Sequence, residues 1–157
     1  MIRPITPDDK TALIILAEKV GLFGPNELKV LDEMLTGYFG DNSDSDHFWL
    51  IDDEEEPVGV AYCQSERMTV GTWNLLLIAI RPDRQRQGRG AALIQYVEQM
   101  LTARSERLLL VETSGLESFE GTRAFYRKCG FSEEARIRDF YSSGEDKIIY
   151  RKMLREA

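Results

Sequence analysis

The seven residues from 84 to 90, RQRQGRG, contain three arginines and two glycines in an otherwise acidic chain. They follow an apolar stretch and stand where a helix is expected to begin. The first backbone N–H groups of a helix have no partner within it and lie at the positive end of its dipole. Glycines let a ligand approach such a backbone, and arginines add charge. This combination predicts a phosphate or pyrophosphate site, with a solvated arginine turn as the alternative.

Two other nucleotide-binding motifs are excluded by the same residues. A P-loop has the pattern GxxxxGK[ST], and no lysine follows these glycines. A dinucleotide fingerprint has the pattern GxGxxG, and Leu93 stands where its third glycine would be. Neither a P-loop nor a dinucleotide-binding turn is therefore expected.

Charge and composition narrow the classes of partner. The chain has 157 residues, enough for one domain with a hydrophobic core, and 43% of them are hydrophobic. Its formal net charge of -7 argues against a nucleic-acid-binding protein, which would present a broad basic face. No apolar run is long enough to span a membrane, and the polar start MIRPITPDDK is unlike a signal peptide. We therefore expect neither a nucleic-acid nor a membrane partner.

Cysteine and histidine usage predicts no metal centre. Cys63 and Cys129 are far apart in the sequence and form no CxxC motif. We expect two reduced thiols in a cytoplasmic protein, without a disulfide or a metal site. The only histidine, His47, follows the acidic loop DNSDSD and is expected to be a surface residue rather than a catalytic one.

The expected elements alternate as in an α/β protein. Strands are expected at residues 1–5, 47–53, 57–66, 72–81, 107–114, 135–141 and 147–154. Helices are expected from an N-cap in TPDD to Val20, over 25–38, from near Gly88 onward and over 118–129. The strand 72–81 is nearly all apolar after Asn74, which predicts burial on both faces of a sheet. The acidic stretch 52–57, DDEEEP, is expected to be a solvated turn.

Two blocks of the sequence resemble one enzyme superfamily. The stretch 79–93, AIRPDRQRQGRGAAL, resembles the acetyl-CoA signature of the GCN5-related N-acetyltransferases (GNAT), whose core is [Q/R]-x-x-G-x-[G/A]. Gln85, Gly88 and Gly90 occupy its three defined positions. The stretch 123–131, RAFYRKCGF, resembles the family's later segment, in which an aromatic-tyrosine pair precedes Gly-Phe. The order of elements is similar along nearly the whole chain.

The resemblance implies a fold and an activity. The fold would be an α/β, GNAT-like domain over residues 1–157, with a mixed, mostly antiparallel central sheet of about seven strands flanked by about four helices. The activity would be transfer of an acetyl group from acetyl-CoA to a primary amine, by direct attack in a ternary complex. The acceptor would be a small-molecule amine, an amino acid or a peptide N-terminus. Dimers are common among relatives, so a homodimer is a candidate assembly. The alternative is a catalytically silent regulator that binds acetyl-CoA.

The resemblance also assigns residues to the acetyl-CoA site. Backbone groups of the strand 75–80, particularly at Ile78 and Ile80, would pair with the pantetheine arm, and the backbone near Ile78 is a candidate oxyanion donor. The loop that would hold the pyrophosphate consists of Gln85, Arg86, Gln87, Gly88, Arg89, Gly90 and Ala91. One departure from the family lies in the later block, since Phe119 stands where many relatives have a cofactor-contacting asparagine.

Tyr126 is the candidate for the catalytic acid. It matches the family tyrosine, which would assist the leaving thiolate of CoA, the conjugate base of a thiol with a pKa of about 8.5. The alternative for Tyr126 is an aromatic core residue beside Phe125 and Phe131.

No motif marks the base that would deprotonate the acceptor. An alkylammonium has a pKa of about 10.4 in water, so a proton must be removed before the amine can attack. Glu112 ends a buried strand and is the first candidate, either as this base or as a partner of the substrate ammonium, because a carboxylate there needs a partner. Glu66 and Asp139 are the other candidates.

The acceptor is expected over the first two helices and the loop between the last two strands. Aromatic and acidic side chains there suit a cationic amine, although some of the aromatic residues are equally explained as core. The aromatic candidates are Phe23, Tyr38, Phe39, Phe48, Trp49 and Tyr141.

Overall fold

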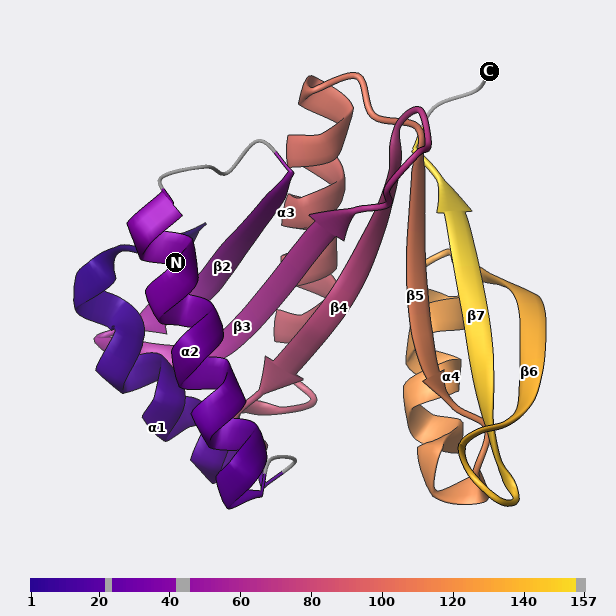
Figure 1. The fold of residues 1–157 in the computed structure, drawn as a ribbon, viewed down its shortest axis with the longest axis horizontal. Coiled ribbons are helices and arrows are strands. Elements are labelled where there is room, and N and C mark those ends of the chain that lie inside the picture. The colour runs from indigo at the N-terminus through magenta and orange to yellow at the C-terminus, as the bar shows by residue number, and fades with distance from the viewer. Residues whose placement is uncertain (22–23, 42–45, 155–157) are drawn as a thin grey trace. The chain divides into compact units, whose positions relative to one another are not determined.

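The computed structural model describes residues 1–21, 24–41 and 46–154, and its strands form one seven-stranded sheet in the order β1-β2-β3-β4-β5-β7-β6 (Figure 1). The strands are β1 Ile2–Pro4, β2 His47–Glu54, β3 Glu56–Ser65, β4 Thr72–Ile80, β5 Leu108–Ser114, β6 Ser132–Ser142 and β7 Glu145–Met153. The α-helices of the described residues are α1 Lys10–Val20, α2 Pro25–Asp41, α3 Arg89–Ala103 and α4 Glu120–Lys128. The pairs β1–β2, β2–β3, β5–β7 and β6–β7 are antiparallel, and β4–β5 is parallel. The predicted, mostly antiparallel sheet with four helices is confirmed.

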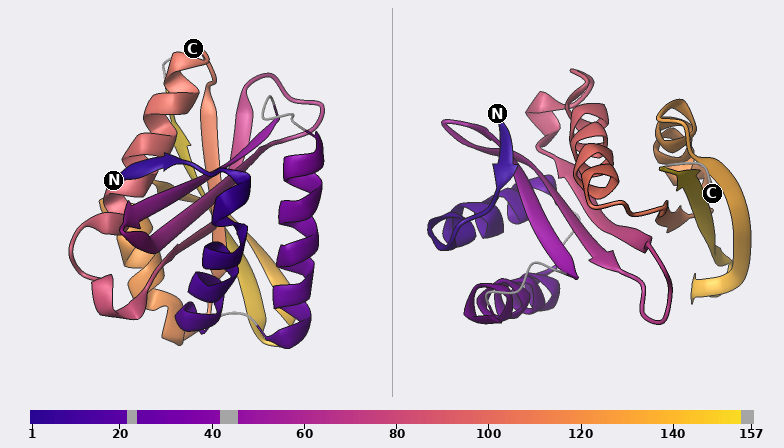
Figure 2. Two further views of the ribbon diagram at one scale, coloured as in Figure 1. Left: turned by 90° about the vertical axis from the view of Figure 1, so that its left-hand side faces the viewer. Right: turned by 90° about the horizontal axis from the view of Figure 1, so that it is seen from above.

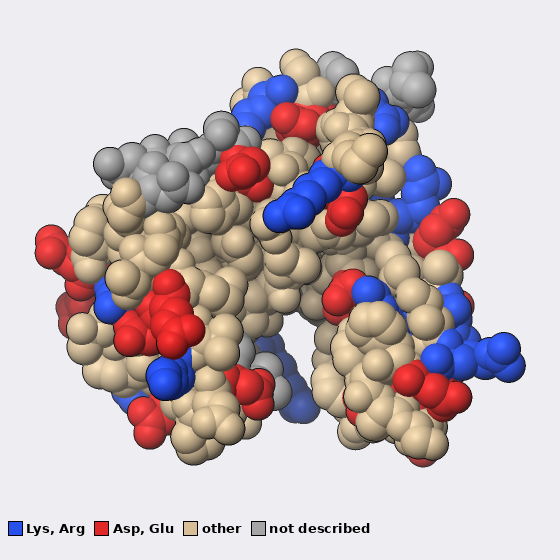
Figure 3. All heavy atoms as spheres, in the orientation of Figure 1, with Lys and Arg blue, Asp and Glu red and all other residues tan. Residues whose placement is uncertain are grey.

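The chain folds into two compact units. Unit 1 comprises Met1–Gln64 with Leu77–Tyr96, and unit 2 comprises Ser65–Leu76 with Val97–Ala157. No helix in the described parts of the chain is long and apolar enough to cross a membrane. On the face shown in Figure 3, acidic and basic side chains are mixed, and neither sign covers the surface.

The core of unit 1 lies between two helices and one face of the sheet. Figure 2 shows α1 and α2 together on one side of β2 and β3, with the first turns of α3 on the other side. Alternation along β2 turns Trp49 and Ile51 toward α1 and α2, where the Trp49 ring stacks on Tyr62 with centroids 4.3 Å apart. The buried residues that the helices contribute are Leu13, Leu16, Ala17, Leu31 and Leu35.

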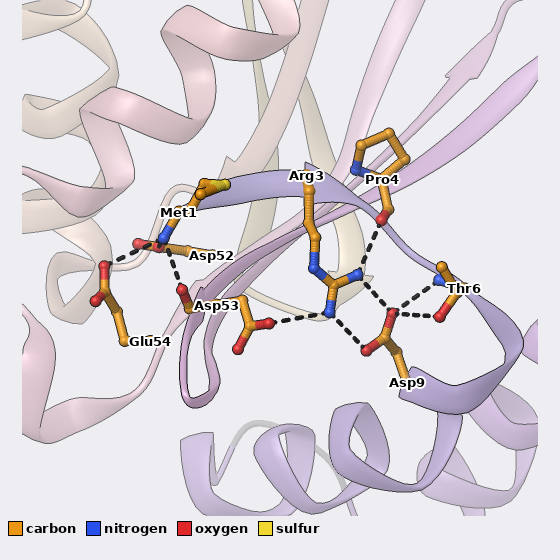
Figure 4. A network of polar contacts seen from close by, with 8 residues as sticks. All are labelled: Met1, Arg3, Pro4, Thr6, Asp9, Asp52, Asp53 and Glu54. Carbon is orange, nitrogen blue, oxygen red and sulfur yellow. Dashed lines mark hydrogen bonds and ion pairs between the residues drawn. The ribbon is translucent and has the colours of Figure 1, made fainter.

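A carboxylate ties the start of α1 to two strands of unit 1 (Figure 4). Asp9, in the 3-10 turn Pro7–Asp9, accepts hydrogen bonds from the backbone N–H of Thr6 at 2.7 Å and from its hydroxyl at 3.1 Å. Arg3 of β1 binds both Asp9 oxygens, at 2.8 and 2.9 Å, and also reaches Asp53 of β2 at 3.0 Å. The hydrogen bond from Arg3 is the main reason that the pKa of Asp9 is lowered from 3.8 to about 2.

The prediction of a solvated turn over residues 52–57 is wrong for its first two residues. Strands β2 and β3 continue into this stretch and leave Glu55 between them, with a left-handed φ of 71°. Asp52 is only 4% exposed, and Asp53 binds Arg3. The turn is short because these acidic side chains find cationic partners, which allows the strands to extend.

Unit 2 is built around the antiparallel pair of β5 and β7. Their register runs from Leu108–Met153 to Ser114–Lys147, and α4 lies along this pair (Figure 1). The helix predicted over 118–129 begins as a 3-10 turn, Glu117–Phe119, before α4. Gly130 follows α4 with a φ of 96°, which confirms the expected left-handed end of this helix.

Replacing Asp9 tests its ion pair. The folded-state pKa lies below the unfolded value, so Asp9 stabilises the fold above pH 3.8, and this contribution is lost as the pH falls toward about 2. We expect Asp9→Asn to lower the free energy of unfolding by about 2 kcal/mol at neutral pH. In urea unfolding measured at several pH values, the difference from wild type should shrink below pH 3.8.

Asp8→Asn is the matched control, because Asp8 is exposed one residue earlier in the same turn. It should leave the free energy of unfolding within about 0.5 kcal/mol of wild type at every pH. A difference for Asp9→Asn that stays constant down to pH 2 would show that Asp9 does not stabilise the fold through its charge.

Candidate functional site

The loop between β4 and α3 is shaped by one side-chain hydrogen bond and two left-handed residues. After the 3-10 turn Pro82–Arg84, the Gln85 side-chain amide donates to the carbonyl oxygen of Ile80 at 3.0 Å. Arg86 and Gly88 have positive φ values of 62° and 80°. A Cβ on Gly88 would meet nothing within 4 Å, so glycine is needed there for its backbone angle rather than for space.

This loop presents a run of unbonded backbone N–H groups. The N–H of Ala92 donates to the Gly88 carbonyl at 3.0 Å, which closes the first turn of α3. Within the described residues, no acceptor takes a hydrogen bond from the N–H groups of residues 86–91. The unbonded groups at a helix start also lie at the positive end of the helix dipole. The geometry therefore suits an anion.

The three arginines of the loop differ in their partners. Arg84 Nε lies 4.0 Å from a carboxylate oxygen of Asp83. Arg86 is exposed and makes no ion pair or hydrogen bond with the described residues. Arg89 is directed toward β2, where its Nη1 donates to Asp52 Oδ2 at 2.9 Å. Among the three, Arg86 is therefore the best placed to give its charge to a ligand.

Strand β4 carries the two isoleucines predicted to contact the cofactor. Ile78 and Ile80 are half-buried, and Leu76 is 46% exposed. The predicted burial on both faces is therefore wrong at Leu76. The register of β4 with β5 runs from Thr72–Leu108 to Leu75–Val111, so Leu76 is the first residue beyond the parallel pairing given by this register. The predicted cofactor residues of β4 and of the loop all belong to unit 1.

Tyr126 lies on α4 in unit 2, and both ends of this short helix are fixed to strands. Arg123 Nη1 donates to the carbonyl oxygens of Ser114 at 2.6 Å and Leu116 at 2.9 Å, at the end of β5. Lys152 of β7 donates to the carbonyl oxygen of Cys129 at 2.7 Å. These bonds hold a helix of nine residues, which would be marginal on its own, in one position.

The Tyr126 side chain is packed, but its hydroxyl is not hydrogen-bonded. The residue is 5% exposed, and its ring centroid lies about 6 Å from those of Phe125, Phe131 and Tyr150. Every fully buried side-chain nitrogen or oxygen of the described residues has a hydrogen-bond partner. The Tyr126 hydroxyl has none there, so it reaches the surface.

Burial keeps the proton on Tyr126. Loss of solvation raises the pKa of its phenol above the ordinary 10.0, and the negative charges of ionised Cys129 and Tyr141 act in the same direction. The group is therefore a protonated hydrogen-bond donor at neutral pH. Tyr126 thus combines the core packing of the simpler interpretation with a donor available to a ligand.

Glu112, the first candidate for the base, is occupied by a lysine. Its side chain is 39% exposed, and Lys147 Nζ of β7 lies 2.7 Å from its Oε2. The same ammonium lies 4.2 Å from the centroid of the Phe140 ring. The partner expected for the Glu112 carboxylate is therefore Lys147. This surface of unit 2 already binds one ammonium through a carboxylate and an aromatic face.

The other two carboxylate candidates have local roles. Glu66 accepts a hydrogen bond from the Asn74 side chain at 2.7 Å. Asp139, which has a left-handed φ of 57°, accepts a hydrogen bond from the backbone N–H of Gly144 at 2.8 Å and so shapes the β6–β7 turn.

The aromatic candidates for acceptor binding divide into core and surface. Phe48 and Trp49 are buried in unit 1, which favours the core interpretation for both. Tyr38 and Phe39 are half-buried, Tyr141 of unit 2 is 43% exposed, and Phe23 lies outside the described residues.

His47 differs from its prediction as a surface residue. It is the first residue of β2 and is half-buried. Its ring meets that of Tyr38 edge-on with centroids 4.8 Å apart, and its Nδ1 lies 3.2 Å from the Tyr62 hydroxyl. Its Nε2 also lies 3.7 Å from Asp46 Oδ1, so the ring has both aromatic and acidic neighbours.

Sequence reasoning missed three residues that organise these sites. Asp52 holds Arg89, Arg123 anchors α4, and Lys147 binds Glu112. Arg123 stands within the motif RAFYRKCGF and could have been found there. Asp52 and Lys147 carry no sequence signal, because each becomes significant only through strand pairing.

Comparison with a family model shows what the chain is similar to. The model described as "Acetyltransferase (GNAT) domain" matches residues 44–133, which include both sequence blocks. No curated protein matches the chain significantly.

Solved structures resemble the whole chain. A Desulfovibrio desulfuricans structure assigned to the GNAT acetyltransferase family is 32% identical, with a TM-score of 0.92 and 99% of both chains covered. The ribosomal-protein-S18-alanine N-acetyltransferase from Escherichia coli is 23% identical, with a TM-score of 0.78 over 100% of this chain and 95% of that one. A Salmonella typhimurium structure with its cofactor acetyl-CoA is 15% identical, with a TM-score of 0.81 over 100% and 95%. The last two similarities concern the fold alone.

Proposed function

The chain belongs to the GNAT acetyltransferase family, and from this premise we propose that it transfers an acetyl group from acetyl-CoA to a primary amine. The observation that carries the proposal is the loop at the start of α3, whose N–H groups from 86 to 91 have no acceptor among the described residues. A diphosphate supplies the anionic oxygens that such groups bind. We propose that residues 1–157 act as a single domain, in the cytoplasm, with Cys63 and Cys129 as reduced thiols.

The loop and β4 would hold the cofactor, which supplies the acetyl group when bound. Gln85 fixes the start of the loop to Ile80 through its amide, so its role is to shape the turn. Gly88, Gly90 and Ala91 would offer N–H groups to the diphosphate, and Arg86 would add a charge. The backbone of Ile78 would pair with the pantetheine arm and donate to the developing oxyanion.

Tyr126 would act on the sulfur atom of CoA. Its phenol is protonated at neutral pH, and its hydroxyl has no partner among the described residues. Because its pKa is raised above that of a thiol, complete proton transfer to a thiolate is unfavourable. We therefore propose that Tyr126 stabilises the departing thiolate mainly by donating a hydrogen bond, with the proton delivered as the charge develops.

The acceptor is proposed to be a small-molecule amine, an amino acid or a peptide N-terminus. An ammonium and a carboxylate with an aromatic face already meet at Lys147, Glu112 and Phe140. A substrate ammonium could replace Lys147 beside Glu112, which would then accept its proton or hold its charge. A homodimer and a silent acetyl-CoA-binding regulator remain secondary proposals.

Titration calorimetry with acetyl-CoA tests the cofactor, with ATP as the comparison ligand. We expect micromolar binding of acetyl-CoA and much weaker binding of ATP, because a pyrophosphate alone does not fill the pantetheine contacts. Gly90→Glu should weaken binding by at least ~100-fold, since it places bulk and negative charge at the loop. Unchanged affinity in Gly90→Glu would refute the loop assignment.

An amine panel, scored by release of free CoA thiol, then tests turnover. Tight binding by wild type without turnover of any amine would favour the regulator.

Replacing Tyr126 separates the two interpretations of this residue. Tyr126→Phe keeps the ring in its aromatic cluster and removes only the hydroxyl. We expect kcat to fall by roughly 100-fold with little change in acetyl-CoA affinity, since the lost bond acts on the departing thiolate. Phe125→Leu is the control for packing and should change the melting temperature more than kcat. Full activity of Tyr126→Phe would return Tyr126 to a purely structural role.

Replacing Glu112 distinguishes a base from an ammonium-binding group. If Glu112 takes the proton, Glu112→Gln should lower kcat by about 100-fold and flatten the rise of rate with pH. If it only binds the ammonium, KM for the amine should rise while kcat and the pH profile stay unchanged. We expect the first result. Glu134→Gln, at an exposed carboxylate of β6 in the same unit that makes no ion pair with the described residues, should do neither.

A further inference from the structure

Arg89 directs its guanidinium toward the acidic end of β2 in unit 1. It is the first residue of α3, and its side chain is 20% exposed. Its Nη1 donates to Asp52 Oδ2 at 2.9 Å and lies 3.4 Å from Glu54 Oε1. Its Nε donates to the side-chain oxygen of Gln87 at 3.2 Å. Three polar side chains therefore surround this guanidinium, and one of them belongs to the loop itself.

Asp52 is a buried carboxylate that depends on this contact. It is 4% exposed, on the face of β2 opposite to the α1–α2 core. Its second oxygen lies 3.3 Å from the amino group of Met1, which also reaches Asp53 and Glu54 (Figure 4). A carboxylate so deeply buried is costly unless cations and donors surround it.

The residues around Asp52 are closely packed. Gly59 of β3 pairs with Asp52 of β2. A Cβ on Gly59 would lie 2.8 Å from Ile80 Cδ1, 3.3 Å from Leu93 Cδ1 and 3.4 Å from Asp52 Cβ. Asp52 is therefore in a rigid place where β2, β3, the end of β4 and the second turn of α3 meet. A side chain bound to it cannot move far.

Arg86 differs from Arg89 because its guanidinium has no acidic partner among the described residues. Its side chain is exposed and has no partner among the described residues, whereas the Arg89 charge is neutralised by a buried acid. An arginine already bound to a carboxylate gives little additional attraction to a phosphate. The two arginines must therefore contribute to anion binding in different ways.

We infer that Asp52 and Arg89 form a positioning pair, which clamps the loop 85–91 and the first turn of α3 onto β2, so that the backbone N–H groups are preset for the diphosphate of acetyl-CoA. The inference rests on the proposed function for its ligand. It assigns Arg89 a positional role in place of a direct phosphate contact, and it makes Asp52 a determinant of cofactor affinity although Asp52 touches no cofactor.

The two possible roles of Arg89 predict opposite effects of Asp52→Asn. If Arg89 binds phosphate directly, removing the Asp52 charge releases the guanidinium and removes a nearby negative charge, so CoA binding should tighten. If the pair positions the loop, the same change loosens the clamp, and CoA binding should weaken. The sign of the change in Kd therefore decides between the roles.

The experiment measures CoA affinity by calorimetry and backbone amide exchange of the ligand-free protein. The variants are Asp52→Asn, Arg89→Met, their double mutant and Arg86→Met. We expect Asp52→Asn to weaken CoA binding by ~10-fold, and Arg89→Met by ~30-fold, because the latter also leaves Asp52 without its arginine. The double mutant should bind no more weakly than Arg89→Met, because the two residues act as one unit.

Amide exchange reports the clamp without any ligand. The hydrogen-bonded N–H groups at the start of α3 are the reporters, beginning with Ala92, which donates to the Gly88 carbonyl oxygen. The N–H groups of residues 92–94 should exchange at least ~10-fold faster in Asp52→Asn and Arg89→Met than in wild type. Arg86→Met should weaken CoA binding a few-fold and leave this exchange unchanged. The double mutant is balanced in charge, and it preserves the test if Arg89→Met folds poorly.

Tighter or unchanged CoA binding in Asp52→Asn would overturn the inference, as would exchange of the amides of residues 92–94 equal to wild type in both single variants. Failure of wild type to bind CoA would overturn the proposed function as well. If wild type binds CoA, the CoA affinities and amide exchange of the variants test the positioning pair alone.

Discussion

A buried carboxylate under the start of α3 is the constraint on which the arrangement of unit 1 depends. Asp52 lies on a strand whose opposite face packs against the hydrophobic core, and the residue is only 4% exposed. It must have cationic partners, and Arg89 and the amino group of Met1 supply them. Because Arg89 is also the first residue of α3, satisfying this charge fixes where the helix begins.

The same region shows how close packing and open backbone are combined. Gly59 lets Ile80 and Leu93 approach the sheet, which brings the end of β4 and the start of α3 together. In the loop between them, Arg86 and Gly88 have left-handed angles, and the N–H groups have no acceptor among the described residues. A backbone binds an anion well when the loop is held rigidly and its N–H groups have no other acceptor.

In unit 2, the side chain of Tyr126 is likewise held rigidly while its donor group is left for a ligand. The short helix α4 is fixed by Arg123 at one end and by Lys152 at the other, so Tyr126 is held by contacts that the tyrosine itself does not make. Its ring is buried, and its hydroxyl has no partner in the part of the chain that the structure describes. Glu112 and Lys147 neutralise each other on a neighbouring strand pair, which keeps a carboxylate available near the surface without leaving it unpaired.

The sequence by itself determined the family, the order of elements and the loop, because glycines, helix starts and alternating strands are local signals. Through the family resemblance, it indicated Gln85, Gly88, Gly90 and Tyr126 as candidate site residues. It misjudged Asp52, His47 and Leu76, because their burial is set by which residues lie opposite on other elements. Only the tertiary structure decided that Arg89 faces Asp52 while Arg86 faces solvent, since both are arginines in one loop and differ only in what the fold places beside them.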